Sequence, residues 1–322
     1  MRSSSPKLSK YWHIGSVRSA HDGESIRYGL YHKGLGELRR CVVFLNGRTE
    51  WLEKYDYIPD QMQLAAGTAF LTWDHRGQGA SGGTRAFIDS YDSFAADAAS
   101  VIEQVIPGLP YVLLAHSMGG LIALYAQLVG MIAPSVQVLC SPLFRLPNAP
   151  LNRKIAQPLL KLMDRPQLRM LNSGIGSFEG VTFGKNNLTH SHEGYQRVVD
   201  NPYPIPTASF GWINATFRAC DVIFDAERIK GLKSPTLVIG GSQESVVDMH
   251  GFSEWVMAGQ AHASVDVAFD LVPGGKHELL NEIPRIRDYA LSMAKEWFAR
   301  HALPMVSHSP DLGNHPAQSQ SQ

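Results

Sequence analysis

The fold of this chain is decided by the stretch Tyr111-Val112-Leu113-Leu114-Ala115-His116-Ser117-Met118-Gly119-Gly120-Leu121-Ile122-Ala123-Leu124. Its first part is a short apolar run, which is typical of a buried strand, and from Leu121 onward the pattern becomes helical. Ser117 therefore stands at a corner between a strand and a helix, with the small residues Ala115 and Gly119 two positions away on either side. This pattern is typical of a nucleophile elbow, a strained turn that presents a serine oxygen. A plain glycine-containing turn would fit it as well, so the hypothesis depends on an acid and a histidine farther along the chain.

The composition is that of a globular, soluble protein. The chain has 322 residues, with 29 basic and 29 acidic side chains and 44% hydrophobic residues. A formal net charge of zero gives no electrostatic reason to expect nucleic acid as a partner. Three cysteines are too few for a disulfide framework or a cysteine metal site, and we expect no metal and no cofactor.

The sequence carries no sign of membrane insertion or export. Residues 1–10 are polar and are not followed by the apolar region of a signal peptide. No apolar run approaches the roughly 20 residues that a spanning helix needs. We therefore expect a cytoplasmic protein.

Strand and helix patterns alternate along most of the chain. We expect strands at 12–18, 25–31, 41–45, 68–73, 111–115, 135–140, 235–239 and 264–271. We expect helices at 51–66, 93–105, 121–128, 208–224, 247–258 and 284–301. Such alternation with short loops predicts an α/β fold, in which a mostly parallel central sheet is covered by helices on both faces.

The alternation stops between residues 141 and 215. This segment contains prolines and helical patches but no apolar run long enough for a buried strand. We interpret it as a helical cap inserted over the catalytic face, because a structureless loop of this length is uncommon in a compact domain. The α/β core would then comprise 12–140 and 216–302, with a disordered lead-in at 1–11 and a disordered tail at 303–322. A loose apolar stripe in the cap could line an acyl channel, pack against the core, or do both: Ile155, Leu159, Leu160, Leu162, Met163, Leu168 and Met170.

The histidine that fits the serine best is His277. In this architecture the chain order is serine, acid, histidine, each in a loop at the carboxyl end of a strand. His277 follows the last expected strand after the tight turn Pro273-Gly274-Gly275-Lys276. The histidines that come later lie at a helix end or in the tail. We therefore expect His277 to be the general base.

Two carboxylates follow the strand at 235–239, and either could orient the histidine. Glu244 lies in the loop just past the strand, and Asp248 lies where the next helix begins. Because an acid at a helix start is well explained as a cap, we prefer Glu244 and keep Asp248 as the alternative.

An oxyanion hole needs two backbone N–H donors. One donor would be Met118, the residue after the nucleophile, and the other would be Arg48 in the loop after an early strand. Gly47 would allow this loop to approach the serine, although a simple strand-to-helix turn with Glu50 as a first-turn acid also explains the pattern. The charged side chains of Arg48 and Glu50 could pair with each other or with the substrate.

Two further histidines lie in turns near the expected site. His75 belongs to the segment Asp74-His75-Arg76-Gly77-Gln78-Gly79-Ala80-Ser81, whose aspartate and glycines suit a tight structural turn. His116 directly precedes Ser117. We expect both to line the site without acting as bases.

With these residues assembled, the chain resembles the α/β-hydrolase superfamily, and within it the serine aminopeptidase-like branch of bacterial lysophospholipases and monoacylglycerol lipases. The segments that carry the resemblance cover both halves of the core: Asn46-Gly47-Arg48-Thr49-Glu50 and on to residue 55, Asp74 to Ser81, Ala115-His116-Ser117-Met118-Gly119-Gly120, residues 241–248, and Gly275-Lys276-His277-Glu278. The chain departs from the usual pattern at Asn46, where the family often has histidine, at Ala115 in place of glycine, and at Glu244 in place of aspartate.

The resemblance implies a serine hydrolase that cleaves carboxylic esters of lipid-like substrates, a lysophospholipid or a monoacylglycerol, through an acyl-enzyme on Ser117. It implies no cofactor, and it leaves room for transient contact of the cap with a membrane surface. The alternatives are a short-chain carboxylesterase, an aminopeptidase or an acyltransferase on the same fold, and a ligand-binding module without activity. The acyl-chain length, the head group and the oligomeric state stay open at this level.

Overall fold

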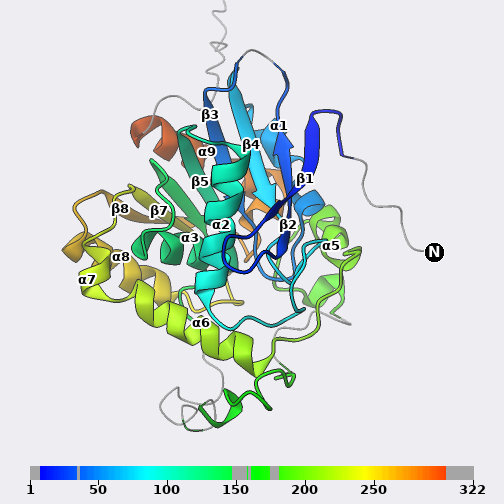
Figure 1. Cartoon of the computed structure of the whole chain (residues 1–322). Coiled ribbons are helices and arrows are strands. Elements are labelled where there is room, and N and C mark those ends of the chain that lie inside the picture. Colours follow the sequence, from blue (N-terminus) through cyan, green and yellow to red (C-terminus); the bar gives the residue numbers. More distant parts are fainter. Residues whose placement is uncertain (1–7, 35–36, 147–157, 159–160, 175–180, 302–322) are drawn as a thin grey trace, which may run out of the picture.

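A computed structural model describes residues 8–34, 37–146, 158, 161–174 and 181–301. Within this part of the chain, eight strands form one sheet in the order β1-β2-β4-β3-β5-β6-β7-β8 (Figure 1). The strands β1 (Trp12–Arg18) and β2 (Ser25–Tyr31) form an antiparallel hairpin, and β2 is also antiparallel to β4. The other strands are parallel to one another: β3 (Arg40–Leu45), β4 (Thr68–Trp73), β5 (Tyr111–His116), β6 (Gln137–Cys140), β7 (Thr236–Gly241) and β8 (Val267–Val272). The predicted mostly parallel sheet is confirmed.

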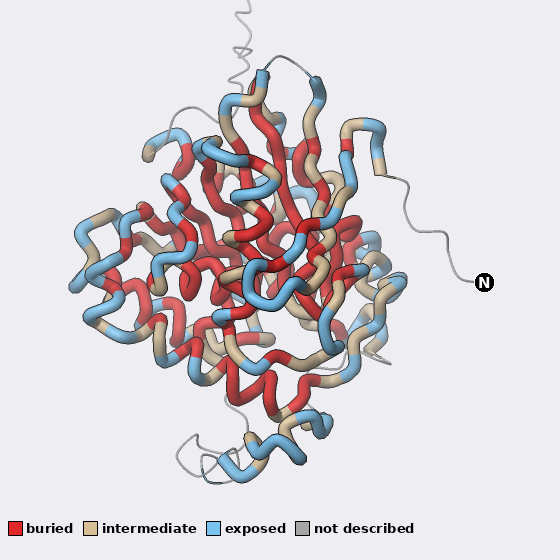
Figure 2. Tube along the Cα trace, viewed as in Figure 1, coloured by how far each residue is buried: buried red, intermediate tan, exposed pale blue. Residues whose placement is uncertain are grey.

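The central strands are apolar throughout because helices cover both faces of the sheet. In β3, Cys41, Val43 and Leu45 point into one apolar cluster, whereas Val42 and Phe44 point into the other. The first cluster is completed by α2 (Tyr91–Val105), α3 (Met118–Leu128), α6 (Phe210–Ile223) and α8 (His250–His262). The second is completed by α1 (Ile58–Met62) and α9 (Pro284–His301). Figure 2 shows the buried chain concentrated in the strands between these layers.

The prediction of one continuous helix at 51–66 is wrong. The structure has a 3-10 helix, η1 (Leu52–Tyr55), followed by the short α1, in which Pro59 lies in the first turn. A continuous helix would place Pro59 in its interior, where the ring lacks an N–H donor and collides with the preceding turn. The chain therefore starts a new helix at this proline.

The insert between β6 and β7 contains helices and, in its described part, no strand of the sheet. It includes η2 (Phe183–Lys185), α5 (His192–Val199) and the start of α6, and the short α7 (Ala226–Ile229) follows. Residues 161–174 attach to the beginning of α6, where the Gly211 amide donates to the Arg169 carbonyl at 2.8 Å. The expected boundaries of the cap at 141 and 215 stay a prediction.

Where the structure describes it, the apolar stripe expected in this insert does not line the cavity beside Ser117. Leu162 and Met170 are 43% and 50% exposed. Ile155, Leu159 and Leu160 lie outside the described residues, as do residues 1–7 of the expected lead-in and the expected tail at 303–322. Helices long and apolar enough to cross a membrane do not occur in the described part of the chain.

The loops that follow β7 and β8 lie in direct backbone contact. The Gln243 amide donates to the Gly275 carbonyl at 2.8 Å, and the Ser242 amide donates to the Val272 carbonyl at 3.0 Å. A Cβ added at Gly241 would stand only 2.1 Å from the Gly275 oxygen. The absence of a side chain at Gly241 therefore allows these two loops to meet.

We expect Gly241→Ala to reduce the free energy of unfolding by about 3 kcal/mol, because the new methyl group must displace backbone of the neighbouring loop. Chemical denaturation measures this change. Gly184→Ala is the matched control, since a Cβ at Gly184 meets no atom within 4 Å. Equal stability of the two variants would show that the two loops do not need this close approach.

Candidate active site

Ser117 occupies a strained corner between β5 and α3. Its backbone has φ 52° and ψ −117°. This conformation is energetically unfavourable for any residue that has a side chain. Backbone hydrogen bonds hold it there, because the Ser117 amide donates to the Cys140 carbonyl at 3.0 Å and its carbonyl accepts from Leu143 at 2.9 Å. The elbow predicted from the sequence is thus present as a geometry.

Two glycines bring the neighbouring loop against this corner. A Cβ at Gly119 would lie 2.2 Å from the Leu45 carbonyl oxygen and 2.5 Å from that of Asn46, so the first turn of α3 packs directly on the end of β3. A Cβ at Gly47 would lie 3.0 Å from the Glu50 carboxylate and 3.1 Å from Nδ1 of His116. Gly119 is therefore needed for the close approach of the two loops, whereas a side chain at Gly47 would require small shifts of Glu50 and His116.

Ser117, His277 and Glu244 form a continuous hydrogen-bonded chain. The Ser117 Oγ lies 3.1 Å from Nε2 of His277, and Nδ1 of His277 lies 2.7 Å from Oε2 of Glu244. The Glu244 side chain is fully buried. Burial raises the pKa of this carboxyl group, but the charge and hydrogen bond of His277 and two backbone N–H groups outweigh burial, so its pKa is lowered. The carboxylate is therefore ionised where it meets the imidazole.

The backbone donors that lower the pKa of Glu244 come from its own loop. Its Oε1 accepts hydrogen bonds from the amides of Val246 at 2.6 Å and Val247 at 3.3 Å. Asp248, the alternative acid, instead accepts from the His250 amide at 3.0 Å, at the start of α8. The structure thus brings Glu244 to the His277 ring and places Asp248 at a helix start.

Both expected oxyanion donors lie at the same end of the sheet as Ser117. Met118 is the first residue of α3, so its N–H has no acceptor inside the helix. Arg48 follows Gly47 in the loop that packs on this helix start, and Arg48 and Ser117 line the same cavity. The Arg48 side chain leaves the loop toward the insert, where Nη2 donates to the Pro206 carbonyl at 2.8 Å.

The cavity has a volume of about 330 Å³, which suits a small ligand. Ser117 and His277 lie in its wall, together with residues of the insert. Its apolar side chains come from loops, from α5 and from α6, unlike the stripe expected from the sequence: Leu143, Leu146, Leu188, Val198, Ala208, Trp212, Val246 and Val247.

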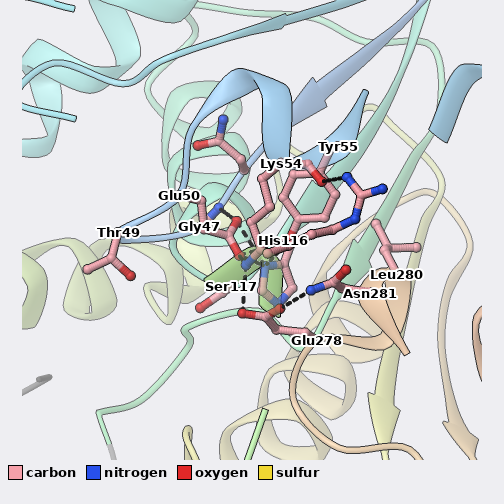
Figure 3. Close-up of polar contacts among 12 residues, drawn as sticks. Gly47, Thr49, Glu50, Lys54, Tyr55, His116, Ser117, Glu278, Leu280 and Asn281 are labelled. Atoms are coloured by element: carbon pink, nitrogen blue, oxygen red, sulfur yellow. Dashed lines mark hydrogen bonds and ion pairs between the residues drawn. The ribbon is translucent and has the colours of Figure 1, made fainter. Parts of the chain in front are cut away.

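A cluster of buried charges lies beside the serine (Figure 3). Lys54 Nζ binds Glu50 at 2.8 Å and Glu278 at 2.7 Å, and His116 Nδ1 lies 3.3 Å from the Glu50 carboxylate. None of these four side chains is more than 5% exposed. Burial raises the pKa of Glu50, but the charges of Lys54 and His116 lower it well below its usual range.

Both ring nitrogens of His116 face hydrogen-bond acceptors. Its Nδ1 faces the Glu50 carboxylate and its Nε2 lies 3.3 Å from the carbonyl oxygen of His277, and both groups accept hydrogen bonds only. Burial lowers the pKa of His116, but the charge and hydrogen bond of Glu50 outweigh burial and raise it. An imidazolium in this place also balances the second carboxylate of the cluster.

The sequence reasoning found part of this cluster. His116 lines the cavity as expected, whereas His75 lies outside the cavity wall; His75 is buried, which lowers its pKa to about 4, and its Nε2 lies 3.1 Å from the Asn46 carbonyl. Lys54 and Glu278 were missed as site residues. The spacing of Lys54 four residues after Glu50 could have indicated an ion pair, but nothing local connects either residue to Glu278.

A group of three or more His, Cys, Asp or Glu side chains arranged to hold a metal ion is absent from the described residues.

We expect Lys54→Met to lower the free energy of unfolding by about 3–5 kcal/mol, because two buried carboxylates lose their ammonium partner. Lys230→Met is the control, since Lys230 pairs with Glu227 on the surface and is 54% exposed. That variant should stay within about 0.5 kcal/mol of the unmodified chain. Chemical denaturation of both checks the expectation, and similar effects of the two substitutions would contradict it.

Comparison with known proteins identifies the family of this chain. The model of the family described as serine aminopeptidase, S33, matches residues 36–284. The chain is 27% identical to lysophospholipase L2 of Escherichia coli over 295 residues, covering 85% of this chain and 84% of that protein. It is 22% identical to the human monoglyceride lipase over 290 residues, covering 87% and 89% of the two chains.

Solved structures share the fold. A soluble variant of the Saccharomyces cerevisiae monoglyceride lipase superposes with a TM-score of 0.71 at 19% identity, covering 92% of this chain and 98% of that one. A carboxyl esterase from Bacillus coagulans gives a TM-score of 0.74 at 18% identity, covering 91% and 99%. Because the family model matches most of the chain and the solved structures share its fold, the chain belongs to the serine aminopeptidase S33 family of α/β-hydrolases.

Proposed function

We propose that this hydrolase cleaves carboxylic esters of lipid-like substrates, a lysophospholipid or a monoacylglycerol, through an acyl-enzyme on Ser117. The observation that carries the proposal is the hydrogen-bonded chain from Glu244 through His277 to Ser117, which ends in a cavity with an apolar wall. The names of the relatives, lysophospholipase and monoglyceride lipase, support this substrate class.

In the first half of the reaction, Nε2 of His277 takes the proton of the Ser117 hydroxyl as its oxygen attacks the acyl carbonyl. The ionised Glu244 holds the ring and stabilises the imidazolium that forms. The imidazolium then returns the proton to the leaving alcohol oxygen as the ester bond breaks, which leaves the acyl group on Ser117. In the second half, His277 takes a proton from water, hydroxide attacks the acyl-enzyme, and the released serine oxygen recovers its proton.

The negative charge of each tetrahedral intermediate would be stabilised by the backbone N–H groups of Met118 and Arg48. The first group lies at the positive end of α3. Because the loop after β3 is held by Gly119 packing and by the Glu50 cluster, these donors require little rearrangement when the charge develops.

The lining of the cavity favours a lipid over a peptide. An aminopeptidase must bind the α-ammonium group of its substrate, for which a carboxylate in the wall is suited. Among the described residues of this wall, the carboxylates are Glu50 and Glu278, and both already bind Lys54. The apolar side chains around them instead suit an acyl chain.

The exposed apolar residues of segment 161–174 support transient contact of the insert with a membrane surface, where such a substrate would be found. Leu162, Met170 and Leu171 are 43%, 50% and 49% exposed. The side chains of this segment would enter the interface without spanning the bilayer.

We expect Ser117→Ala to abolish both hydrolysis of lipid esters and labelling by a fluorophosphonate probe, because the substitution removes the attacking oxygen. The assay uses the purified chain with monooleoylglycerol, oleoyl lysophosphatidylglycerol, a short-chain ester and an aminoacyl amide. Faster cleavage of the short-chain ester or of the amide would replace the proposal by a carboxylesterase or an aminopeptidase. Product that forms only with an added acceptor alcohol would indicate an acyltransferase, and absence of labelling would indicate a binding module.

Glu244→Gln should lower kcat by about 10³- to 10⁴-fold, because a neutral amide cannot stabilise the imidazolium and allows the wrong tautomer of His277. Asp248→Asn is the matched control, and it should change kcat less than about twofold because Asp248 caps the start of α8. Steady-state kinetics with one lipid ester decides between them. A large loss with Asp248→Asn and a small one with Glu244→Gln would make Asp248 the triad acid.

A further inference from the structure

Arg48 is a cation anchored in the wall of the catalytic cavity. Its Nη2 donates to the Pro206 carbonyl at 2.8 Å, and its Cζ lies 5.1 Å from the ring centroid of Trp212, another residue of the cavity wall. A guanidinium over an aromatic face is attracted by the negative face of the ring. The charge is therefore held at a defined place next to the cavity instead of moving in solvent.

The described part of the cavity wall carries cations as well as carboxylates. The carboxylates of Glu50 and Glu278 both bind Lys54, and Glu50 also faces Nδ1 of His116. Arg48 adds a further cation, and burial lowers its pKa to about 10, so it is still charged at neutral pH. A charged group in a partly desolvated wall gains more from a bound anion than the same group in water.

The position of Arg48 in the chain links this charge to the reacting ester. Its backbone N–H is the proposed oxyanion donor, and its side chain extends from there to Pro206 and Trp212 of the insert. A lysophospholipid likewise carries its acyl ester and its phosphate at two ends of one glycerol unit, a span comparable to the length of an arginine side chain. One residue could thus contact both ends of the substrate.

We infer that Arg48 binds the phosphate of a lysophospholipid head group while Ser117 attacks the acyl ester, and that lysophospholipids are therefore preferred over monoacylglycerols. The inference rests on the proposed function and narrows its substrate class. A phosphate offers the guanidinium fork two charged oxygens, whereas the glycerol of a monoacylglycerol offers only neutral hydroxyls.

The competing role for Arg48 is purely structural, since the same contacts attach the loop after β3 to the insert. A structural role would affect both substrates equally, whereas head-group binding affects only the phosphate-bearing one. The ratio of kcat/KM for oleoyl lysophosphatidylglycerol to that for monooleoylglycerol separates the two roles. The acyl chain is the same in both substrates, and the backbone N–H of residue 48 is the same in every variant.

We expect Arg48→Met to reduce this ratio by about 10- to 100-fold, the effect of losing one charged hydrogen-bonding partner. The ratio for Arg48→Lys should lie between those of Arg48→Met and the unmodified chain, because lysine keeps the charge but loses the guanidinium fork and the contact with the Trp212 ring. Arg218→Met is the control, since Arg218 lies on α6 but is 53% exposed and pairs with Asp164 on the surface. An unchanged far-UV circular dichroism spectrum and an unchanged melting temperature in each variant show that the chain is folded.

Binding to the inactive chain keeps the inference separate from the proposed function. Ser117→Ala should bind oleoyl lysophosphatidylglycerol more tightly than monooleoylglycerol, and Arg48→Met in that background should remove the difference. Higher ionic strength should also reduce the difference in affinity between the two lipids. Competition by inorganic phosphate as strong as by the lysophospholipid would show a free-anion site and overturn the head-group assignment.

The outcomes distinguish the two ideas. Hydrolysis of both lipids with an unchanged ratio in Arg48→Met overturns the inference and leaves the hydrolase. Arg48-dependent binding of the lysophospholipid without hydrolysis of either lipid supports the phosphate site and overturns the proposed activity.

Discussion

The ion pairs that Lys54 makes with Glu50 and Glu278 hold together the end of the sheet at which Ser117 lies. Glu50 belongs to the loop after β3 and Glu278 to the loop after β8. His116, at the end of β5, also contacts the Glu50 carboxylate. Burying two carboxylates is costly unless each is paired and hydrogen-bonded. Here Asn281 donates to the second oxygen of Glu278 at 2.8 Å. Tyr55 joins Lys54 at one oxygen of Glu50, and the other oxygen accepts from the Gly47 amide, so every carboxylate oxygen of the cluster has a partner. The cluster therefore requires that the loops after β3 and β8 and the end of β5 are all in place.

This arrangement extends to the residues proposed to react. The Glu50 carboxylate accepts a hydrogen bond from the Gly47 amide, and His116 donates to the carbonyl of His277. One set of charges thus positions the loop of the proposed oxyanion donor and the backbone of the proposed base. Because these groups are in place before a substrate binds, little reorganisation is needed when charge develops on the substrate. The aromatic and apolar layers beneath the cluster exclude water, which strengthens its ion pairs further.

Several features of the fold and the site could be predicted from local pattern. The apolar runs of the parallel strands and the small residues around Ser117 report on burial and on steric room, which are properties of a short segment. The positions of Glu244 and His277 could be chosen because the carboxyl ends of parallel strands meet at one edge of the sheet. The prediction of one helix at 51–66 was wrong because the apolar pattern continues past Pro59, where a new helix begins. The prediction that Leu162 and Met170 line a channel or pack on the core was wrong because the spacing of apolar residues does not show what a helix packs against.

The sequence by itself determined the alternation of strands and helices, the serine corner, and the loops from which an acid and a histidine come. Only the tertiary structure decided that Glu244 meets the His277 ring, that Glu50 binds Lys54 while Arg48 turns toward Trp212, and that Glu278 joins the same cluster. The physical reason is that these contacts join residues far apart in the chain. Their distances are set by the order of strands in the sheet and by close backbone contacts such as Gly241 against Gly275, which no local pattern of residues records.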